Sequence, residues 1–385
     1  MTCKRLSLAL ALSAVLTLTS AHAQDNWNGG TGNWSNGSDW SAGLPGAGND
    51  VVIYSGGNDS VTLDTSPTIN SLTLGGVYQG NYYSQLTDGR VAQTLTITNA
   101  MNIGQTGVLY LTGGTTVSVG ADSSNAGSIF LYKGSTVSIN GNFDNQNEII
   151  TGGGGSQFNV IGTLTNQIEF ELTGAGDSAT VGSIMNTGDV NIGPGATLNL
   201  TNQAGGIQDV PKFSSWEIYG NFEVGGVADT AFASLTSIEG GLDLLDGQTR
   251  NITPIGGTLT ISNSGSFVIG NGTTVSITGN LTNNGVFELG GSGGVANVGT
   301  LVNDGFLSIG TGATLNVATQ LNVTDIPSSS VYDVWGTLNA GSKNAFASLT
   351  SIEGGLVLGN GQTTNTTPIG GTLTISNYGN YLGNL

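Results

Sequence analysis

The sequence predicts an all-β fold, a right-handed parallel β-helix whose turns contain three short strands and about 20 residues. A long internal repeat is the first observation, because AFASLTSIEGGL occurs at residues 231–242 and again, unchanged, at residues 345–356. The second is a shorter unit of about 20 residues inside the long repeat, as in GTLTISNSGSFVIG, GNLTNNGVFELG and GTLVNDGFLSIG. The third is composition, because 65 Gly and only 8% charged residues suit many short strands joined by turns.

Each short unit contains strands in which apolar residues alternate with polar ones. Val275 and Ile277 lie on one face of such a strand, and Ser276 lies on the other. A unit this small cannot bury its apolar side alone. Stacking each strand about 4.8 Å above its copy buries that side, which is the arrangement of a parallel β-helix. The usual crossover chirality predicts the right hand, and a flat sandwich would not require a fixed repeat.

The long repeat predicts how the chain is divided. We expect a signal peptide at residues 1–23, an N-terminal cap and first turns with a Tyr-rich loop at 24–90, and a β-helix at 91–385. Within the β-helix, a cassette is duplicated in tandem at about 155–271 and 272–385. Because recent duplication alone explains near-identity, the repeat predicts a shape and gives no evidence of a chemical site.

The N-terminus has the pattern of a bacterial secretory signal. Lys4 and Arg5 precede an apolar stretch at residues 6–18, which is too short to span a membrane, and AHA at 21–23 is a small-x-small cleavage site. The expected mature chain starts at Gln24 and has no transmembrane segment. We therefore expect a protein that is secreted to the extracellular space or displayed on the bacterial cell surface.

Signal cleavage would narrow the available chemistry. It removes the only Cys and the only His, Cys3 and His22, and so excludes ordinary zinc sites and thiol or Ser–His nucleophiles. With Lys4 and Arg5 also lost, the net charge changes from −18 to −20. Neither a GGxGxD repeat nor an EF-hand loop occurs, so we expect no metal and no cofactor. Nucleic-acid binding is not expected, because the remaining basic residues are scattered: Arg90, Lys133, Lys212, Arg250 and Lys343.

Asparagine recurs in two blocks at steps of about 20 residues, with further Asn at matching places after other strands. Stacked turns would bring these side chains above one another, so that each amide donates to the carbonyl of the next. The alternative is that Asn is common in turns because it tolerates positive φ. The predicted ladder comprises Asn99, Asn125, Asn145, Asn166, Asn186, Asn263, Asn283, Asn303 and Asn377.

The C-terminal end of the second cassette is cut short at Leu385. A last turn with unpaired backbone groups and an open apolar interior normally needs a cap. We expect either self-association through the C-terminal turn, or capping of that turn by residues 378–385.

The mature N-terminus reads WNGGTGNWSNGSDWSAGLPGAGNDVVIYSGGNDSVTLDTSPTINSLTLGG at residues 27–76. This segment and the downstream Gly-x-Leu-x-Asn-x-Gly units resemble secreted bacterial β-strand-repeat proteins. That group includes autotransporter-passenger-like chains and chains with an exosortase sorting signal. The resemblance implies a β-helical, adhesin-like cell-surface protein and is not diagnostic of an activity. The chain differs in ending without a translocator barrel or a sorting tail.

Two aromatic groups near the N-terminus are candidates for carbohydrate binding. Trp27, Trp34 and Trp40 could stack on sugar rings, although a bulky apolar cap over the first turn is the interpretation we favour. Tyr82 and Tyr83 lie in the insert VYQGNYYSQLTDGR, which we expect to be a surface loop.

Acidic and aromatic residues pair at matching places of the two cassettes. Glu217 with Tyr219, and Asp333 with Trp335, should share one face of a strand and could form a carbohydrate subsite. A glycosidase with paired carboxylates is not expected, because Glu217 and Asp333 would be about six turns and about 30 Å apart. The alternative for both pairs is that they lie on an ordinary exposed strand face and bind nothing.

These observations predict a structural or adhesin-like β-helix without catalysis, which makes many weak contacts with extracellular polysaccharide or cell-surface components. The alternative is a polysaccharide-binding β-helix or a polysaccharide-degrading one, a glycosidase or a lyase. A lyase would need a cluster of Asp for Ca²⁺ with a nearby Arg or Lys, and the scattered basic residues do not provide it.

Overall fold

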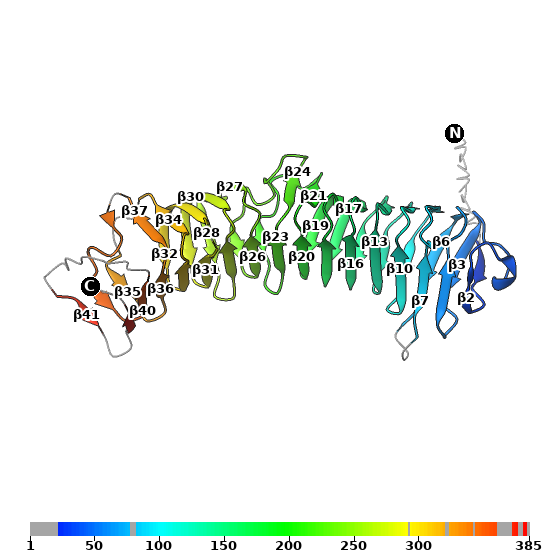
Figure 1. The fold of residues 1–385 in the computed structure, drawn as a ribbon, viewed down its shortest axis with the longest axis horizontal. Helices are drawn as coiled ribbons and strands as arrows, with labels where there is room; N and C mark the ends of the chain where they lie inside the picture. The colour runs from blue at the N-terminus through cyan, green and yellow to red at the C-terminus, as the bar shows by residue number, and fades with distance from the viewer. Residues whose placement is uncertain are drawn as a thin grey trace, which may run out of the picture.

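In the computed structural model, the chain forms a long β-solenoid of about 15 turns (Figure 1). The structure describes residues 22–77, 82–291, 293–319, 323–341, 343–359, 372–375 and 380–382. Strands run in parallel from turn to turn along the long axis, and the short 3-10 helix η1 (Gly37–Asp39) is the one helix among these residues. The predicted fold class, an all-β parallel β-helix, is confirmed.

One face of the solenoid is a single sheet of 16 strands, which we call the continuous face. Every turn contributes one strand to it, in chain order, from the N-terminal end to the C-terminal end (Figure 1). Its strands are β2 (Gly30–Asn33), β4 (Asp59–Thr62), β7 (Ser84–Thr87), β10 (Gly107–Leu111), β13 (Ser128–Tyr132), β16 (Glu148–Gly152), β18 (Glu169–Leu172), β20 (Asp189–Ile192), β23 (Ser215–Ile218), β26 (Gly241–Leu244), β29 (Ser266–Ile269), β31 (Val286–Leu289), β33 (Phe306–Ile309), β36 (Val331–Val334), β40 (Gly355–Leu358) and β42 (Asn380–Leu382).

The other two faces of the N-terminal half belong to one sheet of 14 strands, because two long strands bend from one face to the next. In β17 (Gln157–Asn166), Gln157–Val160 pairs with one neighbour and Leu164–Asn166 with another. The remaining strands are β1 (Ala23–Asn26), β3 (Asn49–Ile53), β5 (Thr68–Ile69), β6 (Ser71–Leu74), β8 (Thr94–Ile97), β9 (Met101–Ile103), β11 (Thr116–Val119), β12 (Ser123–Asn125), β14 (Thr136–Ile139), β15 (Phe143–Asn145), β19 (Ser178–Asn186), β21 (Thr197–Leu200) and β24 (Asn221–Val224).

In the C-terminal half a sheet of nine strands covers both of these faces, because the long strand β30 (Thr274–Asn283) bends as β17 does, and a separate sheet of three strands follows on one of them. The larger contains β22 (Asp209–Val210), β25 (Ser237–Ile238), β27 (Thr249–Ile252), β28 (Thr258–Ile261), β30 (Thr274–Asn283), β32 (Val295–Asn303), β34 (Thr314–Val317), β37 (Thr337–Ala340) and β38 (Lys343–Asn344). The smaller contains β35 (Asp325–Ile326), β39 (Ser351–Ile352) and β41 (Thr374–Ile375). Strand pairing is therefore interrupted between β19 and β22, and again between β32 and β35.

The core follows from the alternation in the sequence. In β31, Phe287 and Leu289 are buried, whereas Val286 and Glu288 point outward. Buried residues of all turns form one cluster that runs through the solenoid, and aromatic rings stack from turn to turn, as Phe267 does on Phe287 with centroids 5.6 Å apart. Stacking therefore buries the apolar side that a single unit leaves open.

A compact cap closes the N-terminal end. Trp27, Trp34 and Trp40 are each at most 3% exposed, and the Trp40 ring lies 5.0 Å from Trp27 and 4.9 Å from Trp34 between centroids. The Trp40 indole N–H donates to the carbonyl of Trp34 at 2.9 Å. No ring face of the three indoles is open to a sugar, so the structure contradicts a sugar-stacking role for them and agrees with the cap.

Parts of the predicted organisation lie outside the described residues. These include residues 1–21 of the expected signal peptide and residues 376–379 and 383–385 of the C-terminal tail, with Asn377 among them. The first strand, β1, begins at Ala23, and the last, β42, pairs in parallel with β40 on the continuous face.

Candidate functional site

A ladder of asparagine side chains runs inside one corner of the solenoid. Asn125 donates from Nδ2 to Oδ1 of Asn145 at 2.9 Å, Asn145 to Asn166 at 2.8 Å, and Asn166 to Asn186 at 2.8 Å. All four are buried. The predicted ladder is confirmed in this block.

Each ladder amide also closes the corner that follows it. Asn166 Nδ2 donates to the carbonyl of Asp189 in the next turn at 2.9 Å, and Gly188 N–H donates to Oδ1 of Asn186 at 3.2 Å. A Cβ on Gly188 would lie 2.2 Å from the carbonyl oxygen of Ile168, so only glycine lets the two turns approach this closely. The ladder therefore satisfies backbone groups that a two-residue corner would otherwise leave unpaired.

The second block of the ladder is shorter. Asn283 donates to Asn303 at 2.6 Å and to the carbonyl of Phe306 at 2.9 Å. Asn263 is exposed and does not join them, because Ile261 is the residue in register with Asn283. Including Asn263 in the ladder was wrong.

Asn99 is also outside the ladder. Ile103 is in register with Asn125, while Asn99 follows a strand at another corner, where it is exposed and donates to Oδ1 of Asn70 at 2.6 Å. Its inclusion was wrong because the corner after Ile103 is longer, and a backbone turn from Gly107 N–H to the Gly104 carbonyl at 2.8 Å takes the place of the side chain.

The predicted acid–aromatic pairs do share one outer face. The Tyr219 hydroxyl donates to Oε1 of Glu217 at 2.8 Å, and the Trp335 indole N–H donates to Oδ1 of Asp333 at 2.7 Å. The strand register places Asp333 five steps from Glu217, about 24 Å at about 4.8 Å per step, rather than the expected six turns and about 30 Å. The two acids remain too far apart to act on one glycosidic bond.

These acids belong to a row of outward side chains on the continuous face, which we call the outer column. The sequence does not show this row directly, because its members come from different turns and meet only through strand register. From the N-terminal side it contains Thr87, Tyr110, Phe130, Ile150, Glu171, Asn191, Glu217, Asp243, Val268, Glu288, Ser308 and Asp333.

The middle of the outer column is acidic. Glu217 is directly in register with Asp243, and burial together with the charges of Glu217 and Glu288 raises the pKa of Asp243 to about 6. Burial, and then the neighbouring Glu169, raises the pKa of Glu171. Carboxylates in adjacent turns therefore resist ionising together. Sequence reasoning missed Asp243, whose place in the strand GLDL could have been aligned with that of Glu217.

The N-terminal end of the outer column is aromatic. Tyr110 lies 6.1 Å from Phe130 and 5.8 Å from Tyr132 between ring centroids, and all three point outward from β10 and β13. Tyr82 and Tyr83 are about half exposed, at 51% and 47%, in the segment that leads into β7 of the same face. Whether Tyr82 and Tyr83 contact sugar stays a prediction.

Among the residues that the structure covers, no group of three or more His, Cys, Asp or Glu has the arrangement of a metal site. One basic residue is internal: Arg250 is 1% exposed and pairs with Asp229 at 3.0 Å and with Asp246. Arg250 is thus a buried ion-pair partner and does not face the outer column.

Within the described ranges, no helix is long and apolar enough to cross a membrane. No protein-family model, curated protein or solved structure matches the chain. The fold itself defines the class, a β-solenoid with a regular outer face.

Proposed function

We propose that the chain is a secreted or cell-surface β-helix protein that acts as a structural and adhesin-like module without catalysis. The observation that carries this proposal is the outer column, which repeats outward side chains at every turn of an unbroken 16-stranded sheet. A regular row of this kind suits a partner that is itself a repeating polymer, since many weak contacts add up to firm attachment.

The chemistry of the outer column supports extracellular polysaccharide as the partner. Tyr110, Phe130 and Tyr132 offer apolar ring surfaces for the C–H faces of sugars, and the carboxylates Glu217 and Asp243 can accept hydrogen bonds from sugar hydroxyls. Tyr219 beside Glu217, and Trp335 beside Asp333, each add an aromatic ring next to an acid.

The alternative is a polysaccharide-degrading β-helix. The adjacent carboxylates Glu217 and Asp243 favour it, since a raised pKa on one of two neighbouring acids is typical of an acid–base pair. Both stand on an open sheet face, where water is not excluded from a bound sugar. We therefore rank adhesion first.

Purified protein on neutral and acidic polysaccharides, such as dextran and alginate, tests both candidates. Adhesion predicts retention by at least one polymer, with no release of reducing ends, and a loss of about tenfold or more in the double variant Tyr110→Ala/Phe130→Ala. Ser308→Ala, in the same column, is the matched control and should bind normally. Release of reducing ends would instead establish the degrading enzyme.

Self-association through the C-terminal turn remains a second proposal for how modules are joined. The pairing of β42 with β40 supports it, because among the described residues no further strand pairs with the outer edge of β42, and an unpaired edge can accept another strand. Light scattering over a concentration series tests it, and a mass that stays monomeric at every concentration would contradict it.

A further inference from the structure

The solenoid wall is open at one corner of the first cassette. In the preceding turns, the residue after each ladder Asn donates its backbone N–H to the backbone carbonyl of the ladder Asn one turn earlier. Thr187, for example, donates to the carbonyl of Asn166 at 2.9 Å. The next residue in this series is Pro211, which has no N–H. Pairing accordingly stops between β19 and β22, while β20 and β23 beside them remain paired on the continuous face.

The interruption leaves backbone groups without partners. Alternation along a parallel ladder points the N–H and C=O of Asn186 away from β17 and towards β22. In the described part of the chain, neither these groups nor the C=O of Ile184 has a hydrogen-bond partner, and the N–H of Ile184 is satisfied by the side chain of Gln203 at 2.9 Å. A short open strand edge is therefore present in the side of the solenoid.

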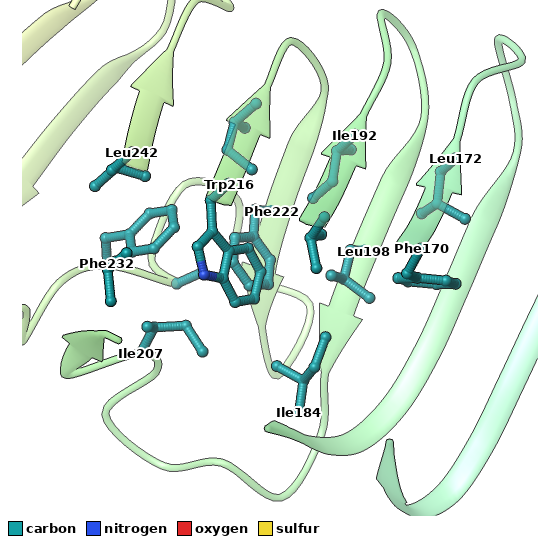
Figure 2. Packing of buried hydrophobic residues seen from close by; sticks show 14 of the residues in the cluster. Phe170, Leu172, Ile184, Ile192, Leu198, Ile207, Trp216, Phe222, Phe232 and Leu242 are labelled. Carbon is teal, nitrogen blue, oxygen red and sulfur yellow. The ribbon is translucent and has the colours of Figure 1, made fainter. Parts of the chain in front are cut away.

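A cavity of about 410 Å³ lies at this edge, a volume in the range of ligand pockets. Its apolar part is formed by Ile184, Ile207 and Trp216, and its polar part by Gln203 and Asp209 among others. Figure 2 shows the Trp216 indole among Ile184, Ile207 and the core rings, with its nitrogen on the side that faces Ile207. Among the described residues that N–H is buried and has no hydrogen-bond partner, so a group that reached it would meet an unused donor.

Pro327 interrupts the same corner of the second cassette, where residues 320–322, which align with Gln203, Ala204 and Gly206, lie outside the described residues. There Leu301, Val323 and Tyr332 enclose a void of only about 10 Å³. Burial raises the pKa of Tyr332 to about 12, and the side chain of Asn303, the last Asn of that ladder, opposes part of this shift. Among the described residues, the larger space at this corner thus belongs to the first copy.

Two large apolar side chains are exposed near the opening of the first copy, whereas at the second the aligned positions carry Val302, 50% exposed, and Ser329. Met185 is 63% exposed in β19, and Phe213, at 83%, is held in the corner after Pro211 with a positive φ of 70°. The corner after Pro327 carries Ser328 and Ser329 instead. Large exposed apolar side chains beside a pocket are typical of an interaction surface.

We propose that the corner between β19 and β22 binds a short extended peptide that carries one bulky apolar side chain. The main chain of the peptide would pair with the open edge of β19, because its N–H and C=O groups alternate with the same spacing as those of Ile184 and Asn186. The apolar side chain would enter the cavity above Ile207, and a peptide carbonyl would accept the free N–H of Trp216. A sugar matches the open edge less well, since its hydroxyls do not alternate with strand spacing.

The test uses the full chain with ¹⁵N-labelled tryptophan, whose five residues give separate indole N–H signals in NMR spectra. The probe is the neutral peptide Ac-Ser-Thr-Phe-Thr-Ser-NH₂. Trp216→Phe assigns the signal of Trp216. We expect this signal to move downfield and saturate as the peptide is added, while the four other indole signals stay in place. The variant Tyr332→Trp adds an indole signal at the corresponding corner of the second cassette, and this signal should not respond.

Three control ligands separate strand pairing from simple apolar contact. Replacing Phe by Ser in the peptide should abolish the shift, and of two versions N-methylated on alternate amides, at least one should bind about fivefold or more weakly. No shift with the parent peptide, or equal binding of both N-methylated versions, would overturn the proposal. A Trp216 shift with cellohexaose but not with the peptide would also overturn it and identify a sugar site.

A second variant keeps the test decisive if Trp216→Phe does not fold. Pro211→Ala retains the indole and restores an N–H opposite the Asn186 carbonyl, which should close the edge and weaken peptide binding about fivefold or more. Pro327→Ala in the second cassette is the matched control. Unchanged peptide binding in Pro211→Ala would contradict pairing at this edge.

Discussion

The two copies of the cassette share one interrupted corner and differ in what lies behind it. In the first copy, the ladder ends at Asn186 beside a cavity of about 410 Å³, and the Trp216 N–H has no partner. In the second copy, Tyr332 stands at the place of Trp216, and among the described residues Leu301, Val323 and Tyr332 line a void of about 10 Å³. The difference teaches that a proline can open a solenoid wall, while the aromatic residue behind it decides whether a cavity persists.

The cores behind the two corners also differ, because Trp216 has more aromatic ring contacts than Tyr332. Trp216 stacks on Phe222 with centroids 5.1 Å apart and meets Phe232 edge to face at 5.9 Å. Tyr332 has one ring contact of this kind, with Phe346 at 5.6 Å. The first copy therefore gains more from aromatic packing and, among the described residues, leaves the buried N–H of Trp216 unsatisfied.

The largest expected effect comes from removing these two rings. Trp216→Ala should cost about 3–5 kcal/mol, and Tyr332→Ala about 1 kcal/mol less, because it loses fewer ring pairs. Hydrogen exchange measured for each segment reports the two copies separately, which matters because long repeat arrays do not unfold in one step. Equal costs in the two copies would show that the ring cluster around Trp216 adds no packing energy.

Next in size is the ladder. Asn166→Ala should cost about 2 kcal/mol, since it removes the bonds from Asn166 to Asn186 and to the carbonyl of Asp189, and takes one acceptor from the amide of Asn145. Asn283→Ala, at the equivalent place, should cost about 1 kcal/mol, because Ile261 precedes it and no side-chain amide loses an acceptor, only the N–H of Gly285. Denaturant melts provide the measurement, with the outward Ser276→Ala as a control that costs under about 0.5 kcal/mol. If Ser276→Ala cost as much as Asn283→Ala, the ladder would carry no stability.

The acidic residues in the middle of the outer column should make the stability of the fold depend on pH. The effect should come from the first copy of the cassette. The pKa of Asp243 is raised from 3.8 to about 6, so the folded state holds this proton more tightly than the unfolded state. The contribution of Asp243 to the free energy of unfolding should therefore be largest below pH 4 and should be lost as the pH rises through 6. Asp243→Asn should remove this fall and stabilise the protein by about 1 kcal/mol at pH 7, a value reduced by solvent screening of the partly exposed carboxyl.

The matched comparison is Val357, which aligns with Asp243 in the second copy and cannot titrate. Thermal melts from pH 4 to 8 should show the same slope for Val357→Ala as for the parent chain. A slope that persists in Asp243→Asn would place the titrating group elsewhere.

The smallest expected effect is that of the prolines. Pro211→Ala adds a hydrogen bond worth about 1 kcal/mol and loses a similar amount because the unfolded chain becomes freer. Its stability should stay within about 0.5 kcal/mol of the parent chain, while amide exchange at Asn186 slows. Pro327→Ala should leave the first copy unchanged. Amide exchange at Asn186 that does not slow in Pro211→Ala would mean that the edge stays open for another reason.

The period, the alternation and the N-terminal cap could be predicted from the sequence because each depends on local pattern. A residue such as Phe287 in VFEL is assigned to the core by its position in the strand, and Trp27, Trp34 and Trp40 are bulky enough to close an open end. The ladder from Asn125 to Asn186 was equally predictable, because constant spacing in the chain becomes vertical stacking when every corner has the same length.

Only the tertiary structure decided what depends on register between turns. Asn263 and Asn99 missed the ladder because the corners after Ile261 and Ile103 are longer and are closed by backbone turns. Glu217 meets Asp243, and Tyr110 meets Phe130, through strand pairing across corners of unequal length. The cavity beside Trp216 has the same origin. Pro211 can be identified in the sequence, but whether the gap it leaves is filled depends on side chains that successive turns bring together, such as Ile184 and Trp216.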